Sequence, residues 1–357
     1  MIIETAKKRI GDGQPVYFVA DIAANHEGDL GRALELIRLA AGAGADAAKF
    51  QNFRAPEIVS EYGFEHLGGG RSHQAHWKRP VYRVYEDASL PWEWTPVLRA
   101  ECDRVGIDFF STPYDLEAVE MLDPYVSLFK IGSGDIDWME MLTAVAARGK
   151  PVILATGASE MREVTRAVKH ILAINPALVL LQCNTNYTVS RENFRHINLS
   201  VLRTYLAQFP GVICGLSDHT KGHAAALGAV ALGGKVIEKH FTDDDTRDGP
   251  DHPFSMTPAE WREMVDRTRE LELALGNGEK VVEENERETL VVQRRCIRAA
   301  RPLPAGEVIR REDLKILRPA PPGSIKPSDL DRVIGLRVRI PVPEGDYLRW
   351  AGLEPRT

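Results

Sequence analysis

The stretch VYFVADIAANHEGDLGRALELIRLAAGAGADAAKFQ, residues 16–51, has the pattern of a strand, a helix and a second strand. Its ends, VYFVADI (16–22) and AAKFQ (47–51), are nearly continuous apolar runs, which are typical of strands covered on both faces of a parallel sheet. Between them Asp29 can cap a helix whose apolar stripe extends from Leu30 to Ile37. The stretch therefore predicts two parallel strands joined by a crossover helix.

The same unit recurs along the chain. Six further apolar runs are IDFFST (107–112), VSLFKI (126–131), PVILAT (151–156), LVLLQC (178–183), VICGLS (212–217) and KVIEKH (235–240). A capping box at Thr257–Glu260, with proline at the first helical position, starts a last helix that Gly276 ends. Eight strands and about eight helices in about 275 residues predict a (β/α)8 TIM barrel. A doubly wound open sheet is the alternative, but the GxGxxG phosphate fingerprint of that fold is absent after the first strand.

The chain changes character after residue 276. We expect a TIM-barrel domain over residues 1–276, a charged linker over 277–295, and a small β-rich domain over 296–357. The last segment is rich in proline and glycine and contains short alternating runs such as CIRAAR and GLRVRIPV. Because a core of this size is marginal by itself, we expect this domain to dock on something larger.

Composition limits the function further. The 357 residues carry a formal net charge of −6, which argues against nucleic acid as a partner, because phosphate contacts need a basic surface. The absence of a signal peptide and of a long apolar window predicts a cytoplasmic protein with no membrane partner. Four widely spaced cysteines predict reduced, mostly buried thiols.

Polar side chains follow the predicted strands at their carboxyl ends, where TIM barrels carry their active sites. They are Asp21, Lys49, Gln51, Thr112, Lys130, Ser133, Thr185, Tyr187, Ser217, Asp218, His219, Lys239 and His240. Each alone could cap a helix or extend to water. Together they predict one active site at the mouth of the barrel.

Lys49 and Lys130, with the hydroxyls of Thr112 and Ser133, suit a phosphate group because they combine positive charge with hydrogen-bond donors. The alternative for Lys49 is a surface cation that follows an apolar strand.

His219 and His240 would end adjacent strands, and two imidazoles suit a divalent metal that also takes water and substrate oxygen. Simple hydrogen bonding by the two rings stays open as the alternative. Asp218 and Asp251 could orient those rings or hold a hydroxyl group.

Three more histidines, His66, His73 and His76, lie in a glycine-rich stretch between the second strand and its helix. We expect a polar loop that overhangs the mouth, with a second metal site as the alternative.

Ordered motifs along the chain resemble the sialic acid synthase family. They are NHEGDL (25–30), GADAAKFQ (44–51), FFSTPYD (109–115), FKIGSGD (129–135), ILATGAS (153–159), GLSDHT (215–220), EKHFTDD (238–244) and GPDHPFSM (249–256). The tail, with LRP at 317–319 and VIG at 333–335, is similar to the family's antifreeze-like (SAF) domain. The resemblance implies condensation of phosphoenolpyruvate with an N-acylated hexosamine to a nonulosonic acid, with release of phosphate.

The resemblance also implies roles for individual residues. Phosphoenolpyruvate would be held by Lys49, Thr112, Lys130, Ser133, Thr185 and Ser217. Gln51, Tyr187 and Asp251 would contact the sugar, and His219 and His240 would bind manganese, with magnesium or cobalt as alternatives. Arg318 would enter the barrel of a partner subunit, which implies a domain-swapped homodimer. A carboxylate at Asp21 would stabilise cationic character at C2 of the enolpyruvate.

Three positions depart from the family pattern. Asp21 stands where glutamate is usual, and its side chain is roughly 1.5 Å shorter, where a 1 Å misplacement can cost about a hundredfold in rate. Ala155 replaces a common serine, and segment 54–84 is longer, which leaves the identity of the hexosamine open.

Two other functions stay open. One is a Schiff-base aldolase that uses Lys49, Lys130 or Lys239. The other is a non-catalytic barrel that binds a sugar or a phosphate.

Overall fold

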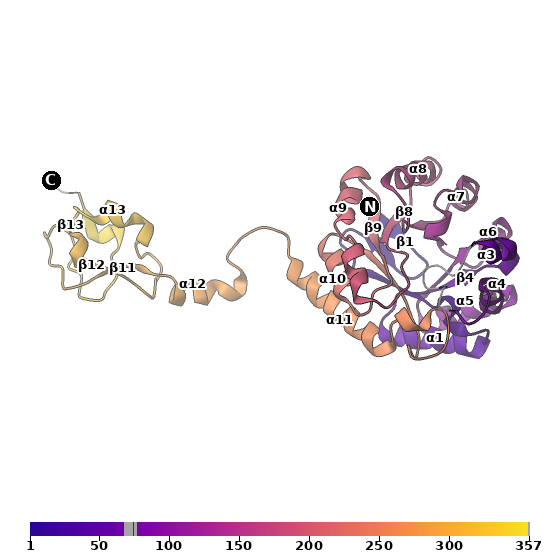
Figure 1. Ribbon diagram of the computed structural model, residues 1–357. Coiled ribbons are helices and arrows are strands. Elements are labelled where there is room, and N and C mark those ends of the chain that lie inside the picture. Colours follow the sequence, from indigo (N-terminus) through magenta and orange to yellow (C-terminus); the bar gives the residue numbers. More distant parts are fainter. Residues whose placement is uncertain (68–73, 75–76, 356–357) are drawn as a thin grey trace. The chain divides into compact units, whose positions relative to one another are not determined.

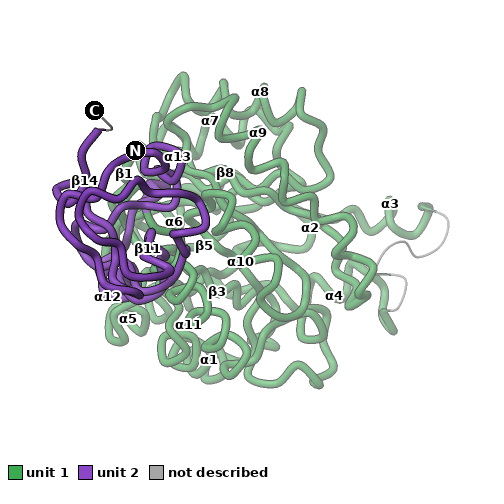
Figure 2. Tube along the Cα trace, turned by 90° about the vertical axis from the view of Figure 1, so that its left-hand side faces the viewer, with its two compact units in different colours: residues 1–276 green, residues 277–357 purple. Residues whose placement is uncertain are grey.

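A computed structural model describes residues 1–67, 74 and 77–355 (Figure 1). The chain divides into two compact units, residues 1–276 and 277–357, which Figure 2 colours separately. His73 and His76, the candidates for a second metal site, lie outside the described residues.

The first unit contains an eight-stranded parallel sheet in the order β5-β4-β3-β10-β9-β8-β7-β6. The terminal strands of this order, β5 and β6, also contact each other, so the sheet closes into the predicted barrel and the open doubly wound alternative is excluded. The strands are β3 (Tyr17–Asp21), β4 (Ala47–Asn52), β5 (Asp108–Pro113), β6 (Phe129–Ile131), β7 (Val152–Ala155), β8 (Leu178–Cys183), β9 (Ile213–Asp218) and β10 (Val236–His240).

Helices surround this barrel, as Figure 1 shows. They are α1 (Leu30–Ala43), α5 (Thr95–Val105), α6 (Leu116–Leu122), α7 (Met139–Ala146), α8 (Met161–Leu172), α9 (Val201–Gln208), α10 (Ala224–Ala231) and α11 (Pro258–Leu275). Two predicted helix starts are confirmed. The Asp29 carboxylate accepts a hydrogen bond from the Arg32 N–H at 2.9 Å, and Thr257 and Glu260 form the capping box of α11.

The amino ends of the strands are closed by a hairpin of β1 (Ile2–Glu4) and β2 (Arg9–Gly11). Thr5, just after β1, donates its hydroxyl proton to Asp108 at 2.5 Å, and the Tyr17 hydroxyl donates to the same carboxylate at 2.8 Å. Asp108 and Tyr17 begin β5 and β3, so this network fastens the end of the barrel opposite the predicted site.

The segment between β4 and α5 differs from the expected loop. Its described part forms α2 (Ala55–Ile58), α3 (Glu61–His66) and α4 (Val81–Ala88). Ser60 caps α3 by accepting the Gly63 N–H at 3.0 Å. The described part of the segment is therefore largely helical, and His66 is an exposed residue at the end of α3.

The second unit begins with residues expected to form a linker, which include α12 (Arg287–Gln293). Its antiparallel pairs are β11 (Cys296–Ala299) with β12 (Leu314–Leu317), and β13 (Arg337–Val338) with β14 (Leu353–Glu354). With α13 (Leu330–Val333) they enclose a small apolar core, so the predicted β-rich domain is confirmed.

One smaller expectation is also confirmed. Cys102, Cys183, Cys214 and Cys296 are buried free thiols. Across residues 1–67 and 77–355, no helix is both long enough and apolar enough to cross a membrane.

Candidate active site

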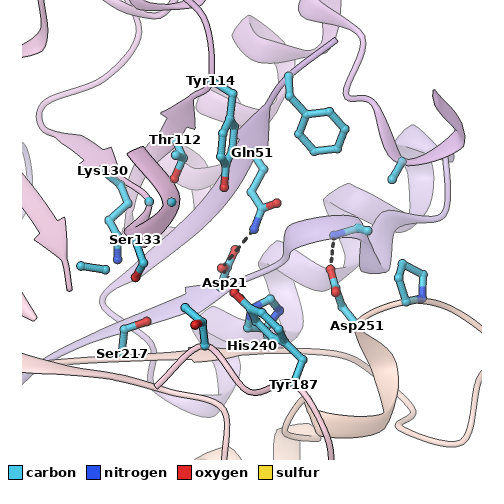
Figure 3. Close-up of a pocket in the computed structure, with 18 of the residues that line it drawn as sticks. Asp21, Gln51, Thr112, Tyr114, Lys130, Ser133, Tyr187, Ser217, His240 and Asp251 are labelled. Carbon is cyan, nitrogen blue, oxygen red and sulfur yellow. Dashed lines mark hydrogen bonds and ion pairs between the residues drawn. The ribbon is translucent and has the colours of Figure 1, made fainter. Parts of the chain in front are cut away.

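A cavity of about 430 Å³ lies at the carboxyl ends of the barrel strands (Figure 3). The predicted site residues that line it are Asp21, Lys49, Gln51, Thr112, Lys130, Ser133, Thr185, Tyr187, Ser217, His219, His240 and Asp251. Three further predicted residues are Asp218, Lys239 and Arg318; the first two do not line the cavity, and Arg318 belongs to the second unit. The barrel thus brings together side chains from strands that are more than two hundred residues apart in sequence.

The strand register explains how Asp21 meets its neighbours. In the parallel pairing, Asp21 of β3 is the partner of Lys49 on β4 and of His240 on β10. The Lys49 Nζ lies 2.6 Å from Asp21 Oδ2, and the His240 Nε2 lies 3.5 Å from the same oxygen. Gln51 donates to this carboxylate at 3.4 Å, as Figure 3 shows. Asp21 is therefore held at the centre of the predicted substrate residues.

Glu238 is a site residue that the sequence analysis did not identify. Its carboxylate accepts two hydrogen bonds from Lys130 Nζ, both at 2.8 Å, and one from the Ser217 hydroxyl at 3.2 Å. Lys49 Nζ lies 3.5 Å away. Side chains alternate along a strand, so Glu238 shares a face of β10 with His240, and that alternation would have identified it.

The same alternation excludes two predicted residues from the cavity. Lys239 points away from it and donates to Asp218 at 2.5 Å and to the Thr220 carbonyl at 2.5 Å. Asp218 also accepts the hydrogen bond of the Thr220 hydroxyl. The expectation that Asp218 orients the histidine rings is therefore wrong, and Lys239 does not face the cavity as an aldolase lysine would.

Charges are almost balanced at the floor of the cavity. Burial would lower the pKa of Lys49, but Asp21 and Glu238 outweigh burial and raise it. Burial lowers the pKa of Lys130, and Glu238 offsets only part of this effect. Burial also raises the pKa of Asp21, although the positive charge of Lys49 partly offsets this effect. The pKa of Glu238 is lowered to about 2, because the Lys130 and Lys49 ammonium groups outweigh its burial. The floor therefore contains two ammonium groups, each paired with a carboxylate.

His219 and His240 lie side by side, with ring centroids 5.3 Å apart. The His219 Nδ1 lies 2.9 Å from the Asn184 carbonyl oxygen. Because a carbonyl only accepts, Nδ1 carries the proton and Nε2 keeps its lone pair. Burial lowers the pKa of both rings to about 3, so both are neutral. The His240 Nδ1 is buried without a hydrogen-bond partner.

This pair fits the chemistry of a metal ligand set, since neutral imidazole is the form that binds a cation. Within the described part of the chain, no group of three or more His, Cys, Asp or Glu side chains is placed to hold an ion. A metal on this pair would therefore complete its coordination with oxygen atoms from water or substrate.

Two hydroxyl groups line the same cavity as the lysines. The Thr112 Oγ1 is buried without a hydrogen-bond partner, so its donor is free for a ligand. Ser133 Oγ accepts the Gly157 N–H at 2.9 Å and keeps its own proton to donate. A Cβ atom at Gly157 would lie 2.4 Å from Thr185 Cγ2 and 3.0 Å from Ser133 Oγ, so this packing requires glycine.

Two carboxyl groups lie nearer the mouth. Asp251 accepts the Ala24 N–H at 3.1 Å (Figure 3), and burial raises its pKa to about 6. Asp135 also lines the cavity, and burial, with a smaller contribution from Asp137, raises its pKa to about 6. Asp135 was missed although it ends the quoted motif FKIGSGD, two residues after Ser133. Groups with such pKa values can exchange protons near neutral pH.

Comparison with known proteins gives matches over both units. The NeuB family matches residues 36–280, and the SAF domain matches residues 294–354. An N,N'-diacetyllegionaminic acid synthase of Legionella pneumophila is 33% identical over 96% of this chain and 96% of its own. The human N-acetylneuraminate-9-phosphate synthase is 30% identical over 95% of this chain and 93% of its own.

A solved structure extends the match to three dimensions. The N-acetylneuraminic acid synthetase of Leptospira borgpetersenii, crystallised with citrate, superposes with a TM-score of 0.71 at 31% identity. The superposition covers 81% of this chain and 95% of the other. Sequence and fold comparisons therefore agree.

Proposed function

The chain belongs to the NeuB family, and we propose that it condenses phosphoenolpyruvate with an N-acylated hexosamine, forming a nonulosonic acid and releasing phosphate. One observation carries the proposal: paired lysines, free hydroxyls and two neutral imidazoles line the same cavity. The names of the Legionella and human relatives, both synthases of such acids, support the same reaction class.

In this proposal Lys49 and Lys130 hold the carboxylate and the phosphate of phosphoenolpyruvate. The hydroxyls of Thr112, Ser133 and Ser217 donate hydrogen bonds to the same groups, and Thr185 lies beside them on the cavity wall. Glu238 is the positioning residue for this set, because it contacts both ammonium groups and Ser217. Binding of the substrate anion exchanges part of these internal pairs for pairs with the ligand.

His219 and His240 would hold a divalent metal, with manganese proposed first and magnesium or cobalt as alternatives. When bound, such an ion polarises the aldehyde oxygen of the sugar. The charge balance of the floor supports this assignment. Two carboxylates already neutralise Lys49 and Lys130, so an added cation would favour a substrate that carries several negative charges.

The carbon–carbon bond forms when C3 of the enolpyruvate attacks the aldehyde carbon of the sugar, positioned by Gln51 and Tyr187. C2 gains cationic character as its electron pair moves into the new bond, and the Asp21 carboxylate stabilises that charge. Water then adds at C2 and gives up a proton to Asp251 or Asp135, whose pKa values near 6 suit an acceptor. That proton passes to the former aldehyde oxygen, which becomes a hydroxyl. The bond between C2 and the phosphate oxygen then breaks, and phosphate leaves with the proton of the C2 hydroxyl, which becomes the keto group of the product.

The second unit enters the proposal through Arg318. We propose a homodimer in which Arg318 of one copy completes the sugar site of the other. Mixing inactive Arg318→Ala and Lys49→Ala variants would then restore activity, because one site of each mixed dimer is intact. Continued inactivity of folded, mixed dimers would contradict the exchange.

The direct test of the function is phosphate release from phosphoenolpyruvate with a panel of N-acylated hexosamines, with and without manganese. The aldolase alternative requires a neutral lysine. The pKa of Lys49 is raised, whereas burial lowers the pKa of Lys130, which pairs with Glu238 at 2.8 Å, so Lys130 is the lysine that the trapping test examines. If borohydride traps a pyruvate adduct and a chelator has no effect, the aldolase replaces our proposal. If no acceptor supports release but Asp21→Glu creates it, the natural protein is a binding barrel.

A further inference from the structure

Asp251 lines the cavity from the segment between β10 and α11, residues 241–257, which we call the rim segment. Its carboxylate accepts the Ala24 N–H at 3.1 Å (Figure 3). Ala24 belongs to the segment between β3 and α1, residues 22–29, which we call the β3–α1 segment. The place of the Asp251 carboxylate therefore depends on how the rim segment is held against the β3–α1 segment.

A buried histidine joins the same two segments. None of the His252 surface is exposed, and His252 directly follows Asp251 in the rim segment. Its Nε2 lies 2.9 Å from Glu27 Oε1, and its Nδ1 lies 2.8 Å from Thr242 Oγ1. Burial lowers the pKa of His252, although Glu27 partly offsets this effect, so the ring is neutral. Because a carboxylate only accepts, Nε2 donates its proton to Glu27, and Nδ1 accepts the proton of the Thr242 hydroxyl.

Glu27 is the point at which contacts between the segments converge. Besides His252, its carboxylate faces Arg32 of α1 at 3.7 Å and Arg247 of the rim segment at 3.6 Å. Both arginines also pair with Asp243, at 2.6 Å and 3.1 Å respectively. Most of these contacts connect the rim segment with the β3–α1 segment or with the start of α1, so they hold the rim segment in place.

The backbone on both sides is shaped around the contact between Glu27 and His252. Ala23 and Glu27 have φ angles of 45° and 52°, in the left-handed region, which persists at such residues only where surrounding contacts hold it. In the rim segment, a Cβ atom at Gly249 would lie 2.6 Å from His252 Cδ2, so the ring packs directly on the Gly249 backbone.

We propose that Glu27 and His252 are positioning residues, whose contact clamps the rim segment to the β3–α1 segment and thereby fixes the Asp251 carboxylate at the sugar end of the cavity. The inference rests on the proposed function, in which Asp251 contacts the sugar, and it adds two residues that act through Asp251. His252 does not line the cavity, and Glu27 lines only an adjoining hollow.

The test compares Glu27→Ala with Glu27→Gln. Glutamine keeps an oxygen that accepts the His252 proton, whereas alanine removes it, and both arginines keep Asp243 as a partner. Glu27→Ala should lower kcat/KM for the hexosamine that the panel identifies by about tenfold or more, with the KM for phosphoenolpyruvate unchanged, because a shift of about 1 Å misplaces Asp251. Glu27→Gln should keep most of the activity. Equal losses in the two variants, or none in either, would overturn the clamp.

An Asp251→Asn background separates positioning from general damage. Residues that act through one another have non-additive effects, so Glu27→Ala should add little to the loss that Asp251→Asn causes alone. Asn25 also joins the segments, through hydrogen bonds to the Phe241 carbonyl at 2.9 Å and the Ser255 hydroxyl at 2.8 Å, and should keep these variants folded. A further tenfold loss in the double variant would overturn the inference.

A measurement without substrate distinguishes failure of the clamp from failure of the proposed function. Burial raises the pKa of Asp251 to about 6, while Asp21 and Lys49 act on it in opposite directions. Loss of the clamp should admit water and return this pKa toward its usual range. The change with pH, between pH 4 and 7, in the stability difference that Asp251→Asn causes should therefore shrink when Glu27 is alanine. An undiminished change would overturn the clamp. A diminished change, in a protein whose wild type shows no acceptor-dependent phosphate release, would support the clamp and overturn only the proposed function.

Discussion

Glu238→Gln is the change that most directly perturbs the charge network beneath the cavity. Glutamine keeps the shape of the side chain but removes the negative charge that faces Lys130 at 2.8 Å and Lys49 at 3.5 Å. All three side chains are buried, with glutamate and lysine exposures of 5% or less. Removing one partner of a buried pair costs about 3–5 kcal/mol, because the other charge stays buried without compensation.

The expected result is a large loss of thermal stability that anions reverse. At about 2–4 °C per kcal/mol for a unit of this size, the melting temperature should fall by about 10 °C. Phosphoenolpyruvate should raise the melting temperature of Glu238→Gln more than that of the wild-type protein, because its anionic groups replace the missing carboxylate. Circular dichroism melts with and without the ligand measure both effects.

The stability of the Glu238→Gln variant should also depend on pH. Without Glu238, burial lowers the pKa of Lys130 further below its unfolded value. The unfolded state then binds more protons than the folded state, so stability of the variant rises with pH over that range. The loss in free energy of unfolding of the variant, relative to the wild-type protein, should be smaller at pH 9 than at pH 7. The control is Glu140→Gln on the exposed face of α7, which should change stability by less than about 0.5 kcal/mol.

Two results would contradict this role of Glu238. One is a melting temperature of Glu238→Gln equal to that of the wild-type protein, and the other is an equal rise of both melting temperatures with phosphoenolpyruvate. Either result would mean that Glu238 does not compensate the two lysines, or that the lysines do not receive the ligand.

Three further predictions concern other parts of the site. His219→Ala should lose metal-dependent activity, and it should bind no metal in equilibrium dialysis. The control His66→Ala, which changes an exposed histidine, should keep both properties. Metal binding retained by His219→Ala would exclude His219 as a ligand. Asp21→Asn should lower kcat by about a hundredfold or more with little change in the KM for phosphoenolpyruvate, and an unchanged kcat would remove Asp21 from the reaction. The pKa of Asp251 is raised to about 6, so the folded state holds a proton that the unfolded state has lost. As pH rises from about 4 to 7, the free energy of unfolding of the wild-type protein should therefore fall relative to that of Asp251→Asn. Parallel pH–stability curves for these two proteins would contradict the raised pKa.

The barrel could be predicted from the sequence because each strand is an apolar run with a polar carboxyl end, and the barrel fold places those ends together. This reasoning located Lys49, Lys130 and His240 correctly. It did not resolve which face of a strand a polar residue occupies. Glu238 was therefore missed, and Asp218 was wrongly expected to orient the histidine rings, whereas it pairs with Lys239. Alternation within the predicted strand 235–240 would have placed Glu238 on the face of His240 and Lys239 on the opposite face.

The helices α2, α3 and α4 could not be predicted for a different reason. Helices of four to eight residues are unstable alone and form through tertiary packing, here around Phe53 and Tyr85. This packing joins residues from β4 to α4, so no local pattern in segment 54–84 indicates it. The role of Arg318 stays a prediction, because it depends on a second copy of the chain.

The most direct test of the proposed chemistry follows an ¹⁸O label placed in the bridging oxygen between C2 and phosphorus of phosphoenolpyruvate. Reaction with the preferred acylated hexosamine should release one phosphate for each sugar consumed, with the label in the phosphate, because the C2–O bond breaks. Phosphate release without an acceptor, or label retained in the organic product, would contradict a condensation in this cavity.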